Sequence, residues 1–124
     1  LIFTSWIRTI DIVYAGLDIV ALTSFNEGTP VSLIEAQASS RPVISTNVGG
    51  IENVVENGVS GILTDVSISS FSKNLICLVD NEEQRNTFGK NGSKSVFDKY
   101  NYNRLVKEIS ALYYKLLETN QIGD

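Results

Sequence analysis

The chain has 124 residues, 43% of them hydrophobic and 19% charged, which is the balance of one globular domain with a buried core. Its net charge of −4 and its scattered Lys and Arg residues argue against a nucleic-acid partner. No apolar stretch approaches the roughly 20 residues that cross a bilayer, no signal peptide is visible, and a single cysteine excludes a disulfide framework. We expect a cytoplasmic protein, with the inner membrane surface as a further location by analogy only.

The contents of histidine, methionine and cysteine allow three further inferences. Histidine is absent, so any acid–base step needs carboxylates or residues supplied from elsewhere. Methionine is also absent, and Leu1-Ile2-Phe3 resembles the tail of a strand, which predicts a fragment excised from a larger protein. The flanking apolar residues predict that Cys77 is a small buried hydrophobe rather than a reactive thiol.

The first half of the chain alternates helical and strand patterns. Apolar residues at helical spacing predict a helix over 9–17, and the apolar run at 18–22 predicts a buried strand. A loop at 23–29 leads to a helix that begins with Pro30 as its first residue, after Thr29 as N-cap. That helix is predicted to end at Ser39-Ser40.

The second half ends in helices. We expect a strand over 43–45, a turn at Gly49-Gly50, a short helix over 51–56 and a strand over 61–63, followed by helices over 67–79, 82–97 and 103–118. Strands joined by helical crossovers predict a doubly wound α/β fold with a parallel sheet covered on both faces. Ligands of such sheets bind beyond the carboxyl ends of the strands, where the 23–29 loop and Gly49-Gly50 lie.

The segment from Glu27 to Glu35 has two carboxylates around the start of a helix. The unpaired N–H groups there can hold a phosphate without a basic side chain, and Gly28 lets a ligand approach the backbone. A carboxylate can accept two hydrogen bonds from a vicinal diol, so the pattern fits a nucleotide sugar. The alternative is that Glu27, Thr29 and Ser32 cap the helix while Glu35 is a solvated helix residue.

This segment resembles the E-x7-E signature of the retaining GT-B glycosyltransferases called family 4. Residues 18–24 resemble the family's ADVFVLPS strand, 35–36 and 41–44 its EAMAAGxPVVA segment, 48–51 its VGGIPE turn, 57–63 its DGxTGxLV turn, and 100–117 its FSW motif and last amphipathic helix. Nearly the whole chain, from Phe3 to about Glu118, is covered in order. The resemblance implies a Rossmann-like, C-terminal half of a GT-B fold.

The resemblance also implies roles for single residues. Glu27, the catalytic candidate, would bind hydroxyls of the donor sugar, and Glu35 would hold the ribose diol. Backbone groups of Gly28, Thr29, Pro30 and Val31 would meet the diphosphate, and Gly49 and Gly50 would form a pocket wall, unless that pair is only a tight turn that needs positive φ. The implied donor is a nucleotide sugar, in most such families a UDP-sugar, used without a metal or other cofactor. A glycan or lipid-linked acceptor, as in polysaccharide biosynthesis, would bind an N-terminal domain.

Residues 1–124 would then be one partial nucleotide-sugar-binding domain, without the acceptor domain and the first part of its own sheet. We therefore expect the isolated chain to transfer no sugar, and to self-associate through the truncated sheet edge. We expect three departures from the family. Its basic Arg and Lys, which neutralise the leaving diphosphate, would lie upstream of Leu1. Ser40 replaces a family glycine at a helix C-terminus, and Glu52 does not align with the acid of the family's IPE turn. The alternative functions are a non-catalytic nucleotide-binding module and a GT-B sugar-nucleotide epimerase.

Overall fold

The computed structural model describes residues 1–120, so the last four residues of the expected domain lie outside the described part. Three strands form one sheet in the order β1-β2-β3: β1 (Val20–Leu22), β2 (Val43–Thr46) and β3 (Gly61–Thr64). Both pairings are parallel. The doubly wound α/β architecture predicted from the alternating pattern is therefore confirmed.

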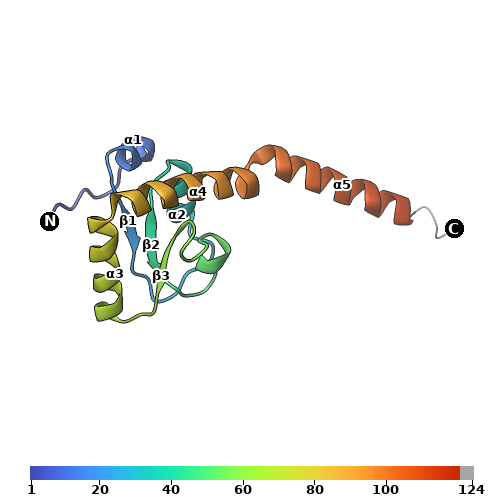
Figure 1. Ribbon diagram of the computed structural model, residues 1–124. Coiled ribbons are helices and arrows are strands. Elements are labelled where there is room, and N and C mark those ends of the chain that lie inside the picture. Colours follow the sequence, from blue (N-terminus) through green and yellow to red (C-terminus); the bar gives the residue numbers. More distant parts are fainter. Residues whose placement is uncertain (121–124) are drawn as a thin grey trace.

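The described part of the chain also contains five α-helices and one 3-10 helix (Figure 1). They are α1 (Ile10–Ala15), α2 (Val31–Ala38), the 3-10 helix η1 (Ile51–Asn53), α3 (Ile68–Asp80), α4 (Glu82–Tyr100) and α5 (Tyr102–Asn120). Helix α4 packs against both α2 and α3. Helix α5 follows α4 and extends away from the body of the molecule.

Strand β2 is the centre of the core. All four of its residues are buried, and successive side chains point to opposite faces of the sheet. Val43 belongs to a cluster with Tyr14 and residues of α2, whereas Ile44 belongs to a separate cluster with residues of α3 and α4. A strand covered by apolar clusters on both faces is typical of a parallel sheet.

Helix α2 ends in a Schellman motif at Ser40. The N–H of Ser40 donates to the carbonyl of Gln37 (2.9 Å), and the N–H of Arg41 donates to the carbonyl of Ala36 (2.9 Å). Ser40 has a φ of 56°, the left-handed conformation expected at this position. The backbone of Ser40 also touches Gly89 of α4, where an added Cβ would lie 2.3 Å from the Ser40 carbonyl oxygen. The helix end thus fixes how closely α4 approaches.

Four predictions at element level need correction. Leu1-Ile2-Phe3 forms no strand, because a strand requires a paired neighbour and no described segment pairs with it. Pro30 is the N-cap of α2 rather than its first residue. The helix expected over 51–56 is only the 3-10 turn Ile51–Asn53. Cys77 is exposed rather than buried, because α3 turns one face of its apolar run toward solvent and only the other toward the core.

Strand β1 pairs only with β2, so its other edge is free among the described strands, and self-association through that edge stays a prediction. A search of the described residues finds no helix with the length and hydropathy of a transmembrane span.

Candidate functional site

The loop after β1 and the turn after β2 meet at the carboxyl edge of the sheet. The N–H of Gly50 donates to the carbonyl oxygen of Glu27 at 3.1 Å. A Cβ added to Gly49, whose φ is +56°, would lie 1.8 Å from the same oxygen, and one added to Gly50 would lie 2.5 Å from the Gly28 carbonyl oxygen. Gly49 is therefore at a turn position that needs positive φ, and both glycines also pack against the Glu27-Gly28 backbone.

The side chain of Glu27 is held by a neighbouring hydroxyl. Ser24 Oγ donates to Glu27 Oε1 at 2.5 Å, and Thr46 Oγ1, at the end of β2, donates to the Ser24 carbonyl oxygen at 2.6 Å. The backbone of the loop is thus tied to the Thr46 side chain of β2, and the Glu27 side chain is held by Ser24 within the loop. Sequence analysis did not identify Ser24 or Thr46, since their role depends on contacts between separate elements.

Helix α2 begins directly after this loop. Its first bonds run from the N–H groups of Leu33 and Ile34 to the carbonyl oxygen of Pro30, so the N–H groups of Val31 and Ser32 precede the hydrogen-bonded ladder. Thr29 is exposed and is not the N-cap, and the N-cap position has no side-chain hydrogen bond. Apart from Gly28 and its two chain neighbours, no atom of the described residues lies within 4 Å of a Cβ built on Gly28, so the approach to this backbone is open. The helix start can accept an anion.

Glu35 contacts the buried Tyr14 of α1. The Tyr14 hydroxyl lies 3.0 Å from the carbonyl oxygen of Ser32 and 3.4 Å from Glu35 Oε2, with both oxygens as acceptors. Burial raises the pKa of Tyr14 above 10.0, and the charge of Glu35 and the hydrogen bond to it raise this pKa further. Glu35 is therefore a positioned carboxylate rather than a freely solvated one.

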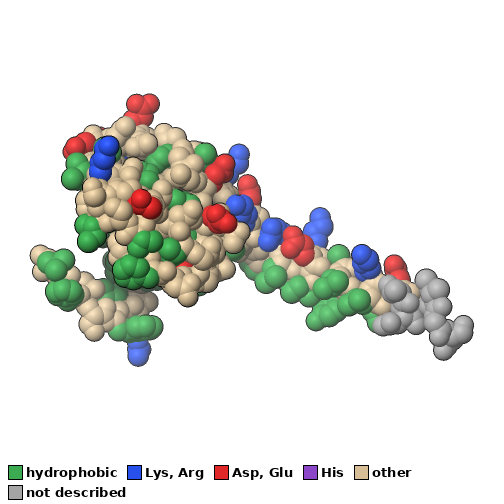
Figure 2. Space-filling view, turned by 90° about the horizontal axis from the view of Figure 1, so that it is seen from below, with side chains coloured by type: hydrophobic (Ala, Val, Ile, Leu, Met, Phe, Trp, Pro, Cys, Tyr) green, Lys and Arg blue, Asp and Glu red, His purple; other side chains and the backbone are tan. Residues whose placement is uncertain are grey.

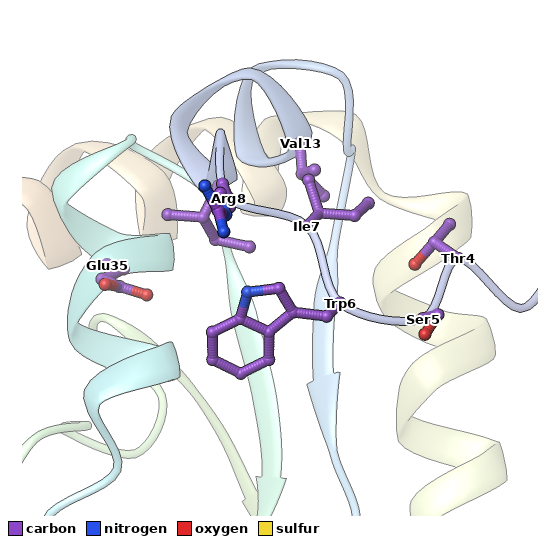
Figure 3. Close-up of a pocket in the computed structure, with 8 residues that line it drawn as sticks. Thr4, Ser5, Trp6, Ile7, Arg8, Val13 and Glu35 are labelled. Atoms are coloured by element: carbon purple, nitrogen blue, oxygen red, sulfur yellow. The ribbon is translucent and has the colours of Figure 1, made fainter.

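Glu35 also lines an open cavity of about 750 Å³ between α2 and the N-terminal segment. Trp6 and Arg8 line the same cavity, and Figure 3 shows the indole ring of Trp6 directed into the space that faces Glu35. Neither residue was predicted, since only Leu1-Ile2-Phe3 of this segment were interpreted, as the tail of a strand. The signal that could have identified them is an aromatic and a basic residue just before the first helix.

The structure thus brings most of the predicted site residues together. Glu27, Gly28, Thr29, Pro30 and Val31 form one continuous segment, with Gly49 and Gly50 packed behind it. Glu35 lies further along α2, in the cavity with Trp6, and Glu27 is not part of that lining. Within residues 1–120 no group of three His, Cys, Asp or Glu side chains could hold a metal ion. The expectation that no metal is used stays a prediction.

Chemically, the site offers two carboxylates on either side of a helix start that can bind an anion. The carboxylates can accept hydrogen bonds from hydroxyl groups, and the N–H groups between them can donate to phosphate oxygens. The indole ring of Trp6 and the guanidinium of Arg8 line the cavity beside Glu35, where a flat, polar ring system could stack.

Comparison with known proteins identifies relatives of this chain in sequence and in fold. N-acetyl-alpha-D-glucosaminyl L-malate synthase of Bacillus anthracis is 30% identical over 107 residues, which are 86% of this chain but 28% of that protein. HepE of Anabaena, solved in complex with UDP, superposes with a TM-score of 0.76 at 25% identity, over 83% of this chain and 29% of HepE.

A third relative is itself a single domain. The C-terminal domain of LpcC, a group 1 glycosyl transferase of Francisella tularensis, superposes with a TM-score of 0.69 at 28% identity, over 82% of this chain and 53% of that structure. The chain spans less than a third of the length of the B. anthracis relative. The sequence pattern described as "Glycosyl transferases group 1" matches residues 1–95. The chain belongs to the glycosyl transferases group 1 family.

Proposed function

We propose that this chain is the donor-binding, C-terminal half of a retaining glycosyltransferase of family 4. In this proposal it holds a nucleotide sugar, with UDP as the nucleotide, while a glycan or lipid-linked acceptor binds a preceding domain. The observation that carries the proposal is the packing of Gly49-Gly50 against Glu27-Gly28, directly before the start of α2. In this proposal the contact holds one carboxylate beside the helix start that would bind the diphosphate.

Each part of the donor has a matching group. The diphosphate would lie at the helix start, where the N–H groups of Val31 and Ser32 can donate to its oxygens. The hexose would lie toward Glu27, whose carboxylate can accept from two sugar hydroxyls while Ser24 fixes its orientation. Glu27 is the catalytic candidate because it would touch the sugar that is transferred.

The nucleoside would occupy the cavity along α2. If Glu35 accepts hydrogen bonds from the ribose diol, the base must lie within a few ångströms of this carboxylate, and the cavity lined by Trp6 and Arg8 is the space at that distance. Stacking of a base on an aromatic ring contributes about 1–3 kcal/mol. Support for a uridine nucleotide comes from HepE, whose structures were solved with UDP and with UDP-glucose.

Catalysis would also need groups that stabilise the departing diphosphate. Among the described residues, the groups that we assign to the diphosphate are backbone N–H groups of α2. Electrostatic stabilisation of the leaving group is usually the largest catalytic contribution. We therefore propose that the 124-residue chain binds the donor but transfers sugar only as part of a longer protein that supplies the second wall of the cleft.

The direct test is calorimetric titration of the folded chain with UDP, UDP-glucose and glucose 1-phosphate. The proposal expects saturable binding of both nucleotides and much weaker binding of glucose 1-phosphate, which lacks the nucleoside. Glu52→Gln is the matched control, because Glu52 is an exposed carboxylate in η1. Failure of the folded chain to bind either nucleotide at millimolar concentration would remove the donor-site assignment. With a longer protein, product analysis would separate transfer from epimerisation.

A further inference from the structure

Tyr14 is the buried side chain through which α1 meets α2. It is 6% exposed and belongs to the apolar cluster that includes Leu33 and Ala36 of α2. The hydroxyl at the end of its ring lies 3.0 Å from the carbonyl oxygen of Ser32 and 3.4 Å from Glu35 Oε2. Packing of the ring therefore holds the hydroxyl at one place between two oxygens of α2.

The hydroxyl stays a hydrogen-bond donor at neutral pH. Burial and the charge of Glu35 raise the pKa of Tyr14 above its ordinary value of 10.0, so the proton is retained. A tyrosine hydroxyl has a single proton, which the two neighbouring oxygens must share. Distance favours the Ser32 oxygen, whereas charge favours the Glu35 oxygen, because hydrogen bonds to a carboxylate are the stronger ones.

The Glu35 carboxylate keeps enough acceptor positions for a ligand. Its two oxygens offer about four lone-pair positions, and Tyr14 occupies one of them. Glu35 also lines the cavity with Trp6, and Figure 3 shows its carboxylate on the side of α2 that faces the indole ring. The carboxylate can thus be held by Tyr14 and still accept two hydrogen bonds from a molecule in the cavity.

We propose that Tyr14 is a positioning residue for nucleotide recognition, whose hydroxyl holds the Glu35 carboxylate in the orientation that accepts both hydroxyls of a ribose. The inference rests on the proposed function, in which Glu35 binds the ribose diol, and it adds the group that acts through Glu35. A glutamate side chain rotates about several bonds, and this freedom is lost when the carboxylate binds a ligand. A carboxylate that is held in advance loses less conformational entropy on binding.

Ser32 offers a competing role for the same hydroxyl. The N–H of Ser32 is one of the two groups proposed to meet the diphosphate, and its carbonyl oxygen is the nearer acceptor for Tyr14. A hydroxyl that acted there would steady the start of α2, and it would influence phosphate binding whether or not the ligand has a ribose diol. The two roles therefore differ in one measurable respect, which is their dependence on the ribose hydroxyls.

Calorimetric titration of the 124-residue chain with UDP and with 2′,3′-dideoxy-UDP tests the proposal. The second ligand has the same base and diphosphate but no ribose hydroxyls. We expect the wild type to bind dideoxy-UDP about tenfold to a hundredfold more weakly than UDP. Tyr14→Phe removes the hydroxyl but keeps the buried ring. It should lower the affinity for UDP about fivefold and leave the affinity for dideoxy-UDP within about twofold of the wild type.

A double-mutant cycle identifies the residue through which Tyr14 acts. In a Glu35→Gln background, Tyr14→Phe should cause no further loss of UDP affinity, because the carboxylate that the hydroxyl positions is gone. Tyr113→Phe is the matched control and should leave both affinities unchanged. Tyr113 is 64% exposed on α5, which projects from the body of the molecule in Figure 2.

The ratio of the two affinities decides between the roles. Equal affinities of the wild type for UDP and dideoxy-UDP would overturn the ribose assignment of Glu35 in the proposed function, and the role of Tyr14 with it. A wild-type preference for UDP that Tyr14→Phe retains in full would overturn the role of Tyr14 alone. An equal fall for both ligands in Tyr14→Phe would also overturn it, and would assign the hydroxyl to the start of α2 through Ser32. A purely structural role in the core would not change the ratio.

Discussion

The carbonyl oxygen of Glu27 accepts a hydrogen bond from the N–H of Gly50, so the loop after β1 and the turn after β2 hold each other at the carboxyl edge of the sheet. Two loops that follow neighbouring parallel strands meet at one edge, which is where such folds bind ligands. The contact joins two backbone segments, and it can form because Gly49 and Gly50 have no side chains.

Gly49→Ala should break this contact. The new Cβ would overlap the Glu27 carbonyl oxygen, and alanine would also have to adopt a positive φ. We expect a loss of at least about 3 kcal/mol in the free energy of unfolding, measured by urea denaturation. Gly58→Ala is the matched control, since Gly58 has a φ of +76° but open space around its Cβ, and it should cost about 1 kcal/mol. Equal losses for both variants would show that only the backbone conformation matters.

Ser24→Ala should affect the sugar end of the donor and not the nucleotide. The variant removes the hydroxyl that donates to Glu27 Oε1, so the carboxylate loses its fixed orientation. Affinity for UDP-glucose should fall about tenfold in calorimetric titration, with UDP affinity unchanged. Ser69→Ala, at an exposed position of α3, serves as the control. A parallel fall for both ligands would place Ser24 in the fold of the loop rather than in sugar recognition.

Ser40→Gly should stabilise the protein. Ser40 lies in the left-handed conformation that closes the Schellman motif of α2, and glycine adopts it without the strain of a Cβ. We expect a gain of about 0.5–1 kcal/mol in the free energy of unfolding, seen as a higher melting temperature. Ser39→Gly is the control, because Ser39 has a φ of −83° and should not gain. A lower melting temperature for Ser40→Gly would contradict the strain argument.

Local signals in the sequence were sufficient for most of the fold. The apolar run that includes Val20–Leu22, the helical repeat of α2 and the turn at Asn57-Gly58 all depend on residues close in the chain, so their elements could be predicted. The resemblance also placed Ser40 at a helix C-terminus where the family has glycine, and its positive φ is the conformation that such a glycine favours. Leu1-Ile2-Phe3 was predicted wrongly because strand formation depends on a pairing partner, and no composition of three residues supplies one.

The site was predictable only in part, because some of its contacts join residues that are far apart in the chain. The segment from Glu27 to Val31 is continuous, so its residues could be selected from the sequence, and the structure brings Gly49 and Gly50 against it. The contacts that fix the carboxylates, Thr46 to Ser24 and Tyr14 to Glu35, join residues about twenty positions apart. Such pairs follow from packing of whole elements, which no single stretch of sequence specifies.

Tyr14→Phe should change how stability depends on pH. Because the pKa of Tyr14 is raised above 10.0 in the folded state, the neutral hydroxyl contributes stability that is fully present below pH 10 and is lost as pH rises through the folded pKa. The variant should be less stable by about 1 kcal/mol at neutral pH, and this difference should shrink above pH 10. Urea denaturation from pH 8 to 11.5 measures it, with the exposed Tyr113→Phe as control. A difference that stays constant with pH would contradict the assigned contact with Glu35.

The roles of Glu35 and Glu27 can be distinguished by the ligand whose affinity each substitution lowers. Glu35 is assigned to the ribose, which every nucleotide donor contains, so Glu35→Gln should lower the affinities for UDP and UDP-glucose alike, by about tenfold to a hundredfold. Glu27 is assigned to the hexose, so Glu27→Gln should lower the affinity for UDP-glucose alone. Both residues are half-buried in the structure and each is held by one hydroxyl, so the two substitutions perturb comparable surroundings.

Titration of both ligands against both variants gives four affinities, with Glu52→Gln as the control for an exposed carboxylate. Unchanged UDP affinity in Glu35→Gln would remove the ribose assignment and leave Glu35 as the acceptor that positions Tyr14. Loss of UDP affinity in Glu27→Gln would instead indicate that this carboxylate orders the helix start on which the diphosphate is proposed to lie. Because Glu35→Gln should lower both affinities and Glu27→Gln only that for UDP-glucose, the two roles can be accepted or rejected one at a time.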